Sequence, residues 1–216
     1  MAEQDFDTSD MYAVHDALRH EFARLPITVK AVAEGDAERA AIVGGHVLLM
    51  VDFLHVHHSG EDETVWPLLR ERSPESEELV DDMEIQHALI HAASEMARTQ
   101  AQEWMDSPGN QERAALHTTL IALEREMLKH LAMEEQEVLP LVGRYFTAEE
   151  YAKVGEHSRA HIPQERMPIV LGLILDNTSK ERGDAIVNSM PPEAIAAFEQ
   201  FGRPAYAEYK AHITAY

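Results

Sequence analysis

The sequence predicts an all-α protein, an up-down-up-down four-helix bundle that is followed by additional C-terminal helices. Over four long stretches, apolar residues recur at alternating steps of three and four, which is the period of an amphipathic helix. Short turn-forming segments separate these stretches, as in helical bundles. We find no convincing period-two alternation of the kind that marks a strand. These observations together favour a bundle over any sheet-containing fold.

The first two helices are expected over residues 9–33 and 36–71. Pro26 should kink or interrupt the first of them, because proline lacks the amide hydrogen of the helical ladder. Gly35 followed by Asp36 signals the end of one helix and the start of the next. The expected inward positions are Met11, His15, Leu18, Phe22 and Leu25 in the first helix, and Ile42, His46, Met50, Phe53, His57 and Glu61 in the second.

The third and fourth helices are expected over residues 75–105 and 111–143, with a loop at residues 106–110 between them. Pro67 and Pro140 lie within or near the ends of helical patterns, where they either terminate a helix or kink it. The expected inward positions are Val80, Met83, His87, His91 and Ser94 in the third helix, and Leu116, Leu120, Leu123, Met127, His130, Glu134 and Leu141 in the fourth.

The C-terminal part of the chain should contain several shorter helices. Thr147 and Glu150 have the spacing of a capping box, which marks the start of a fifth helix. Five prolines after residue 151 break the later helical patterns. We therefore predict a four-helix bundle over residues 1–145 and a helical extension over residues 146–216 that packs on it.

The composition excludes several classes of function. The net charge of −21 repels phosphate backbones and anionic lipids, so we expect neither nucleic acid nor a membrane as a partner. The longest apolar run, residues 169–175, is too short to cross a bilayer. The acidic first ten residues do not resemble a signal peptide, which favours a cytoplasmic location. The chain has no cysteine but thirteen histidines, so a metal site would use imidazole and carboxylate ligands.

Two segments of the chain align without gaps, one starting at His57 and the other at His130. Each has a histidine, a glutamate four positions later, a valine eight positions later and a proline ten positions later. In the first unit, His15 lies 42 residues before His57, and in the second, His87 lies 43 residues before His130. The repeat unit is therefore a helix pair, and two such pairs should face each other with pseudo-twofold symmetry.

The spacing within each unit points to a metal site. Residues four apart lie above one another on a helix, so a histidine and a glutamate at this spacing can reach one point on the bundle axis. A carboxylate can bridge two metals, and His91, four positions after His87, adds a ligand to one half. Burying such carboxylates without cations would be costly. The candidate ligands, a complete set for two metals, are His15, His57, Glu61, His87, His91, His130 and Glu134.

The order of these residues, a histidine followed by HxxxE, HxxxH and HxxxE, resembles the bacterial type of the hemerythrin, or HHE cation-binding, family. The resemblance covers roughly residues 10–145, and residues 61–67 and 134–140 look like the family signature. It implies a centre of two iron ions with an oxo or hydroxo bridge. Glu61 and Glu134 would bridge the two irons.

The resemblance also implies an asymmetric centre. One iron would be bound by His87, His91 and His130, and the other, with an open position, by His15 and His57. The oxygen carriers of the family use an aspartate five residues after the last histidine, whereas Glu134 follows at four. In this spacing the chain looks more like other bacterial and regulatory relatives than like the oxygen carriers. The difference argues against a pure carrier role. Zinc or manganese remains an alternative occupant, because the ligand types do not settle the metal.

The remaining histidines favour ordinary roles. His55 and His58 flank His57 and should point away from its face, towards solvent, and His20 is also turned aside. His46 is either a hydrogen-bonding group near the metals or a satisfied core histidine. A second i, i+4 pair, His157 and His161, could mark a second metal site but is more simply explained as surface or satisfied core histidines.

Three functions remain open at this point. The protein could bind a small diatomic ligand, O2 or NO, for sensing, storage or stress response. It could instead be a di-iron enzyme that decomposes peroxide, or an iron- or oxygen-responsive regulatory module with residues 146–216 as output surface. That segment could also form a homodimer contact. A ferritin-type oxidase is disfavoured, because only one Glu-x-x-His motif occurs, Glu84 to His87.

Overall fold

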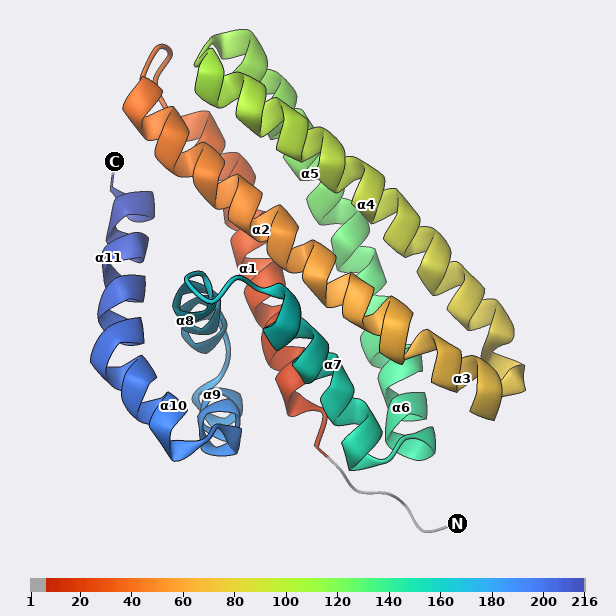
Figure 1. Cartoon of the computed structure of the whole chain (residues 1–216). Helices are drawn as coiled ribbons and strands as arrows, with labels where there is room; N and C mark the ends of the chain where they lie inside the picture. Colours follow the sequence, from red (N-terminus) through yellow and green to blue (C-terminus); the bar gives the residue numbers. More distant parts are fainter. Residues whose placement is uncertain (1–6, 216) are drawn as a thin grey trace.

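The computed structural model describes residues 7–215, and this part of the chain is helical without any strand. Residues 1–6 of the acidic N-terminal segment, together with Tyr216, lie outside the described residues. Four long helices form an antiparallel bundle (Figure 1): α1 (Ser9–Ala31), α2 (Ala37–Thr64), α4 (Glu77–Asp106) and α5 (Asn110–Met133). The predicted fold class is confirmed.

The core of the bundle follows the three-and-four spacing of apolar residues. All four long helices contribute side chains that are almost completely excluded from water, and each such burial stabilises the fold by about 1.5–3 kcal/mol. The largest contributors to this main core include Leu18, Phe22, Leu25, Met50, Leu54, Ile90, Trp104, Leu116, Leu120 and Leu123. A second apolar cluster lies around Trp66, Met83 and Phe146. The two clusters lie at different positions along the length of the bundle.

The turn between α1 and α2 has the predicted signals. Gly35 adopts a φ of 79°, which residues with a Cβ rarely adopt. Asp36 then caps α2, and its carboxylate accepts a hydrogen bond from the Arg39 amide at 3.0 Å. Pro26 lies inside α1 without ending it, so the expected interruption at this proline does not occur.

Both helices that carry the HxxxE motifs continue beyond a local break. α2 is followed, after Val65, by α3 (Trp66–Arg72), and a short 3₁₀ turn, η1 (Pro74–Ser76), leads on to α4. α5 continues through a π-helical turn, η2 (Glu134–Val138), into α6 (Leu139–Tyr145). Pro67 and Pro140 stand in the first turns of α3 and α6, where the missing amide hydrogen is tolerated. The prolines therefore mark interruptions after which each helix resumes.

The C-terminal segment covers α1 and α2, and leaves the outer sides of α4 and α5 open (Figure 1). It consists of α7 (Ala148–His161), α8 (Met167–Asn177), α9 (Lys180–Ser189), α10 (Pro192–Ala197), the π turn η3 (Phe198–Gly202) and α11 (Arg203–Thr214). The capping box of Thr147 and Glu150 is present at the start of α7. Ile162, Val170 and Leu173 join the main core. The division into two domains at residue 145 stays a prediction.

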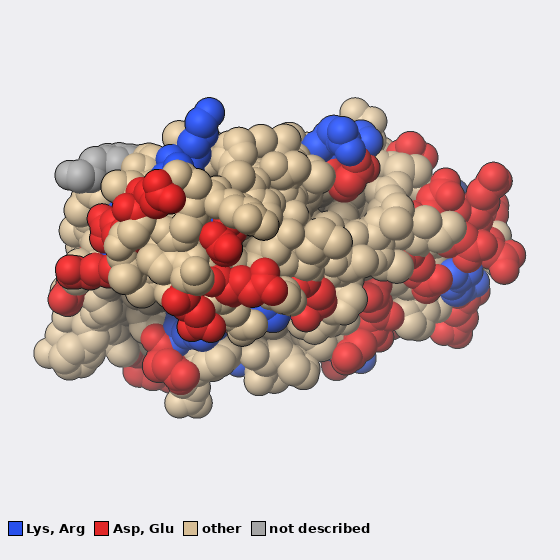
Figure 2. Space-filling model, turned by 90° about the horizontal axis from the view of Figure 1, so that it is seen from above, with Lys and Arg blue, Asp and Glu red and all other residues tan. Residues whose placement is uncertain are grey.

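On the face that Figure 2 shows, acidic side chains are scattered in several groups, mainly along one edge and at one end, and basic side chains form a few smaller groups. In the described part of the chain, one helical stretch, Ala37–Arg72, is long and apolar enough by composition to cross a membrane. This differs from the expectation that no run is long enough. Because 67% of its apolar window is buried inside the protein, the stretch has the properties of a bundle core helix.

Candidate metal centre

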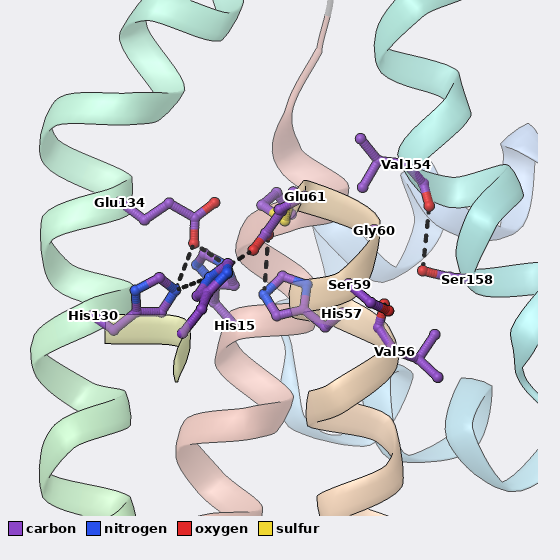
Figure 3. A network of polar contacts seen from close by, with 12 residues as sticks. His15, Val56, His57, Ser59, Gly60, Glu61, His130, Glu134, Val154 and Ser158 are labelled. Atoms are coloured by element: carbon purple, nitrogen blue, oxygen red, sulfur yellow. Dashed lines mark hydrogen bonds and ion pairs between the residues drawn. The ribbon is translucent and has the colours of Figure 1, made fainter. Parts of the chain in front are cut away.

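Histidine and glutamate side chains from all four bundle helices converge on one buried point between the two apolar clusters. Figure 3 shows the side chains of His15, His57, Glu61, His130 and Glu134 pointing towards one another. Each of the seven side chains in the cluster is at most 5% exposed to solvent. They are His15 from α1, His57, His58 and Glu61 from α2, His87 from α4, His130 from α5 and Glu134 at the start of η2.

The cluster consists of two overlapping groups, and in each group the potential ligand atoms lie within 4.8 Å of one another. One group contains His15, His57, Glu61 and Glu134, and the other contains His58, Glu61, His87 and His130. Glu61 belongs to both. One of its carboxylate oxygens lies 3.3 Å from His57 Nε2 and the other 3.4 Å from His87 Nε2. The two oxygens of Glu61 thus face the two halves, as a bridging carboxylate requires.

Glu134 also lies between histidines of both halves. Its Oε2 atom is 3.2 Å from His15 Nε2 and 3.8 Å from His130 Nε2. The π-helical turn begins at this residue, and such turns occur frequently at functional sites. The extra residue per turn changes the direction of the side chains after His130 without ending the helix.

The chemistry of these atoms fits a cation. Buried polar atoms are normally hydrogen-bonded, and an unsatisfied one costs about 1–3 kcal/mol. Most of the buried side-chain nitrogen and oxygen atoms without a hydrogen-bond partner belong to this cluster: His15 Nε2, His57 Nε2, His58 Nε2, both carboxylate oxygens of Glu61 and Glu134 Oε2. A bound cation would satisfy these atoms together.

One contact between two ring nitrogens supports the same interpretation. His87 Nε2 and His130 Nε2 lie 3.1 Å apart. Two nitrogens bound to one metal at about 2.0–2.1 Å and at about a right angle are separated by roughly 3 Å. The two imidazoles are therefore already placed as neighbouring ligands of a single ion.

Two further carboxylates orient the ligand histidines from outside the cluster. Glu135 accepts a hydrogen bond from Nδ1 of His15 at 2.9 Å, and Asp62 accepts one from Nδ1 of His87 at 2.6 Å. This contact directs each Nε2 inward and raises its basicity. Asp62 and Glu135 directly follow the two glutamates of the repeat, Glu61 and Glu134. The role of Asp62 and Glu135 was not predicted from the sequence, although both residues occupy the same position in the two copies of the repeat.

In the absence of a metal, the two glutamates of the cluster have very different pKa values. Burial and the neighbouring charge of Glu134 raise the pKa of Glu61 to about 8. Burial acts in the same direction on Glu134, but the neighbouring charge of His15 outweighs it and lowers the pKa to about 2. Without a metal, one glutamate therefore holds a proton at neutral pH and the other is ionised.

The histidines divide in a similar way. Burial opposes the protonation of His15 and His87, but the acidic groups around them prevail, chiefly Glu134 for His15 and Asp62 for His87, and raise both pKa values to about 9. Burial lowers the pKa of His130 to about 3, with a further contribution from His87. Burial also lowers the pKa values of His57 and His58. Without a metal, His15 and His87 would therefore carry protons at neutral pH.

The structure brings six of the seven predicted ligands together and leaves out His91. The His91 side chain is exposed and lies against His55, with ring centroids 5.3 Å apart. The buried stripe of α4 passes through His87, Ile90 and Ser94, so the inward step after His87 is three residues and not four. The expectation that His91 points at the bundle axis is therefore wrong.

His58 takes the place expected for His91. We expected His58 to face solvent, but its side chain is only 5% exposed and its ring stacks on His87 with centroids 4.1 Å apart. Two adjacent residues on a helix point about 100° apart, so both can reach a cluster that is wide enough to hold two ions. The sequence feature that could have indicated this role of His58 is its position directly after His57.

The other histidines have ordinary surroundings. His20 and His55 are exposed, as expected. His46 is buried and hydrogen-bonded through both ring nitrogens, to Glu21 at 3.1 Å and to Tyr209 at 2.9 Å, which fits a satisfied core histidine. His157 and His161 form a stacked pair, but they are not part of any three-residue ligand group within residues 7–215.

Comparisons with known proteins agree with this geometry. A family model described as the hemerythrin HHE cation binding domain matches residues 7–142, which is more than half of the chain and includes every residue of the cluster. Neither the curated proteins nor the solved structures contain a match to this chain.

Proposed function

The chain belongs to the hemerythrin HHE cation-binding family, and from this premise we propose that it is a non-haem di-iron protein that binds a small diatomic ligand, O2 or NO, at an open coordination position. The family and the ligand cluster both support cation binding. The observation that best supports two ions is that Glu61 belongs to both ligand groups and turns one oxygen towards each.

The donor set fits iron. His15, His57, Glu61 and Glu134 would hold one ion, and His58, Glu61, His87 and His130 the other. Sites of histidine and carboxylate ligands with open positions are typical of non-haem iron. When bound, ferrous ions supply the electrons and the vacant coordination positions that a diatomic ligand needs. A role in sensing, storage or stress response would follow from reversible binding.

The residues around the cluster keep the ligand set oriented. Asp62 and Glu135 fix the ring orientations of His87 and His15. The ring centroid of buried Trp66 lies 5.6 Å from that of His87, and the indole donates a hydrogen bond to Asp62 at 2.8 Å. The Trp66 ring therefore packs beside His87, and its nitrogen holds Asp62 in place.

The test of this proposal is optical. The protein is reconstituted with ferrous iron in the absence of oxygen and then titrated with O2 and, separately, with NO. The proposal predicts a charge-transfer absorption band with at least one of the two ligands. An iron-loaded protein whose spectrum responds to neither ligand would contradict it.

A pocket beside the cluster favours peroxide decomposition as a second candidate. A cavity of about 390 Å³ between α2 and α4 reaches His58 and His87. This volume far exceeds the roughly 30 Å³ that one water molecule occupies in the liquid, so the cavity admits molecules larger than a diatomic gas. The discriminating assay is peroxide consumption by the iron-loaded protein, compared with the variant His57→Ala.

A contact of α7 favours an iron-responsive regulatory role as a further alternative. His157 of α7 lies 3.1 Å from Ser59 Oγ and 3.3 Å from the Glu63 carboxylate, on the turn of α2 that carries Glu61. At Gly60 a Cβ atom would lie 3.3 Å from the His157 ring, so α7 packs closely on this turn. If this role holds, removal of the metal increases protease cleavage within residues 146–216.

Metal binding should release protons. At pH 7 the metal-free cluster holds protons on His15, His87 and Glu61, whose pKa values are raised to about 9, 9 and 8. Ligand atoms must lose their protons to bind a cation, so loading at pH 7 should release about three protons per chain. Calorimetric titration with a divalent cation in buffers of different ionisation enthalpy measures this number. Release of no protons would show that the cluster is not the binding site.

Metal removal should also destabilise the protein. A ligand that binds only the folded state and is present at about 1,000 times its dissociation constant stabilises by about 4 kcal/mol. For a chain of this size, that corresponds to a shift of roughly 10 °C in the unfolding midpoint. We expect chelation to lower the midpoint by this order in a thermal unfolding measurement, and re-addition of the metal to restore it.

A further inference from the structure

The pocket between α2 and α4 joins the protein surface to the ligand cluster. Two histidines that the cluster does not use, His55 and His91, line it together with the acidic residues Asp62 and Glu84. His58 and His87, which belong to the cluster, line it as well. Histidines and carboxylates therefore follow one another from the solvent to the centre.

His55 and His91 lie side by side in the pocket, and their ring nitrogens are free to bind a ligand. Both side chains are exposed, and within residues 7–215 neither makes a hydrogen bond or an ion pair. Their ring centroids lie 5.3 Å apart. Two imidazoles that bind one ion through nitrogens at about 2 Å, with a tetrahedral angle, have their ring centroids about 5 Å apart. The separation of the two rings is therefore compatible with a dication bound between them.

The acidic groups of the pocket favour cations over other ligands. Asp62 and Glu84 are each about half exposed, 47% and 48%, and the whole chain carries a net charge of −21. Arg70 contacts Glu84 at 2.8 Å and is the basic group next to the pocket. A cleft with a predominance of one charge concentrates ions of the opposite sign and accelerates their association.

Two residues of the pocket wall carry a buried polar atom that is free to bind a polar ligand if the side chains move. The hydroxyl of Ser94, a side chain that is only 4% exposed, has no hydrogen-bond partner, and the same holds for Nε2 of His58. Both residues line the pocket. A cation that moves from the His55–His91 pair towards the centre would reach His58 and His87 next.

We propose that this pocket is the metal-uptake route of the protein, in which His55 and His91 capture a divalent transition-metal ion at the surface and pass it to His58 and His87. The inference rests on the proposed function only in that the centre binds metal. It gives His91 a role outside the centre, and it assigns the capture site to residues that are not needed to hold the metals at equilibrium.

The test measures the rate of metal uptake and the final stoichiometry separately. Metal-free protein is mixed with Co²⁺, whose visible absorption reports coordination without a redox step, and the rate is followed by stopped flow. The double variant His55→Ala/His91→Ala should take up Co²⁺ about tenfold more slowly at low metal concentration. Ala88→Trp, at an exposed alanine that lines the pocket, should also slow uptake. The final stoichiometry should be unchanged in both.

A matched control is His20→Ala, an exposed histidine on α1 outside the pocket, which should load at the wild-type rate. Uptake by the double variant at the wild-type rate would overturn the proposal. A lower final stoichiometry would also overturn it, because His55 and His91 would then be ligands of the centre. A wild-type protein that binds no Co²⁺ at all would refute the metal centre itself, and this result is distinct from the other two.

Discussion

Replacement of Glu61 by glutamine should reduce the metal content of the loaded protein from about two ions per chain to about one or fewer. Glu61 is the residue that both ligand groups share, and its two oxygens face different histidines at 3.3 and 3.4 Å. A glutamine keeps the size of the side chain but offers one oxygen and turns an NH₂ group towards the other ion. Substitution of residues that merely orient a ligand costs about 10–100-fold in metal affinity, and we expect a larger loss here.

The measurement is metal analysis after anaerobic loading and desalting. Glu137→Gln serves as a matched control, because Glu137 is an exposed glutamate in the same acidic run as Glu134 and belongs to neither group. It should retain the wild-type metal content. If Glu61→Gln bound as much metal as the control with similar affinity, a shared carboxylate between two ions would be ruled out.

The second large effect is expected from a pair of histidine variants. His58→Gln should lose one ion, whereas His91→Gln should keep the full metal content. His58 is buried against His87 with its Nε2 unpartnered, whereas His91 is exposed and lies outside both ligand groups. The resemblance to the family alone implies the opposite outcome, with His91 as a ligand and His58 in solvent.

Metal analysis at saturation separates the two outcomes, and circular dichroism checks that both variants remain helical. His91→Gln should change only the rate of metal uptake, in line with the proposed uptake route. Full metal content in His58→Gln together with loss in His91→Gln would restore the ligand set implied by the family resemblance and refute the assignment from the structure.

Much of the centre could be predicted because it is repeated in the sequence. The same pattern of a histidine, a glutamate, a valine and a proline occurs after His57 and after His130, and chance does not explain two gapless copies. Helical periodicity then places both copies inward. Six of the seven predicted ligands, all except His91, lie in the cluster that the structure shows.

The errors come from assuming a single inward line on each helix. The buried stripe of α4 alternates steps of three and four, and after His87 it reaches Ile90, so the i+4 position His91 is turned outward. On α2 the cluster is wide enough to take both His57 and His58. All of these histidines are visible in the sequence. Which of them face the bundle axis depends on how the helices pack, because packing decides which face of each helix is buried.

Other features needed the structure for physical reasons. Asp62 and Glu135 reach across the bundle to His87 and His15, and a contact between helices has no periodic signal. The π turn at Glu134 depends on one extra residue in the helical ladder, which helix propensity does not reveal. The position of α7 against Gly60 likewise depends on tertiary packing.

The most direct test of a dinuclear centre is X-ray absorption spectroscopy on the iron-loaded protein. We expect a metal–metal vector at roughly 3.5–4 Å, as in other two-metal sites. The nearest ligands should be nitrogen and oxygen, with no sulfur, because the chain has no cysteine and the cluster contains only histidine and glutamate. A fully loaded protein whose spectrum lacks any metal–metal vector would contradict the account, since its two ligand groups could not then share Glu61.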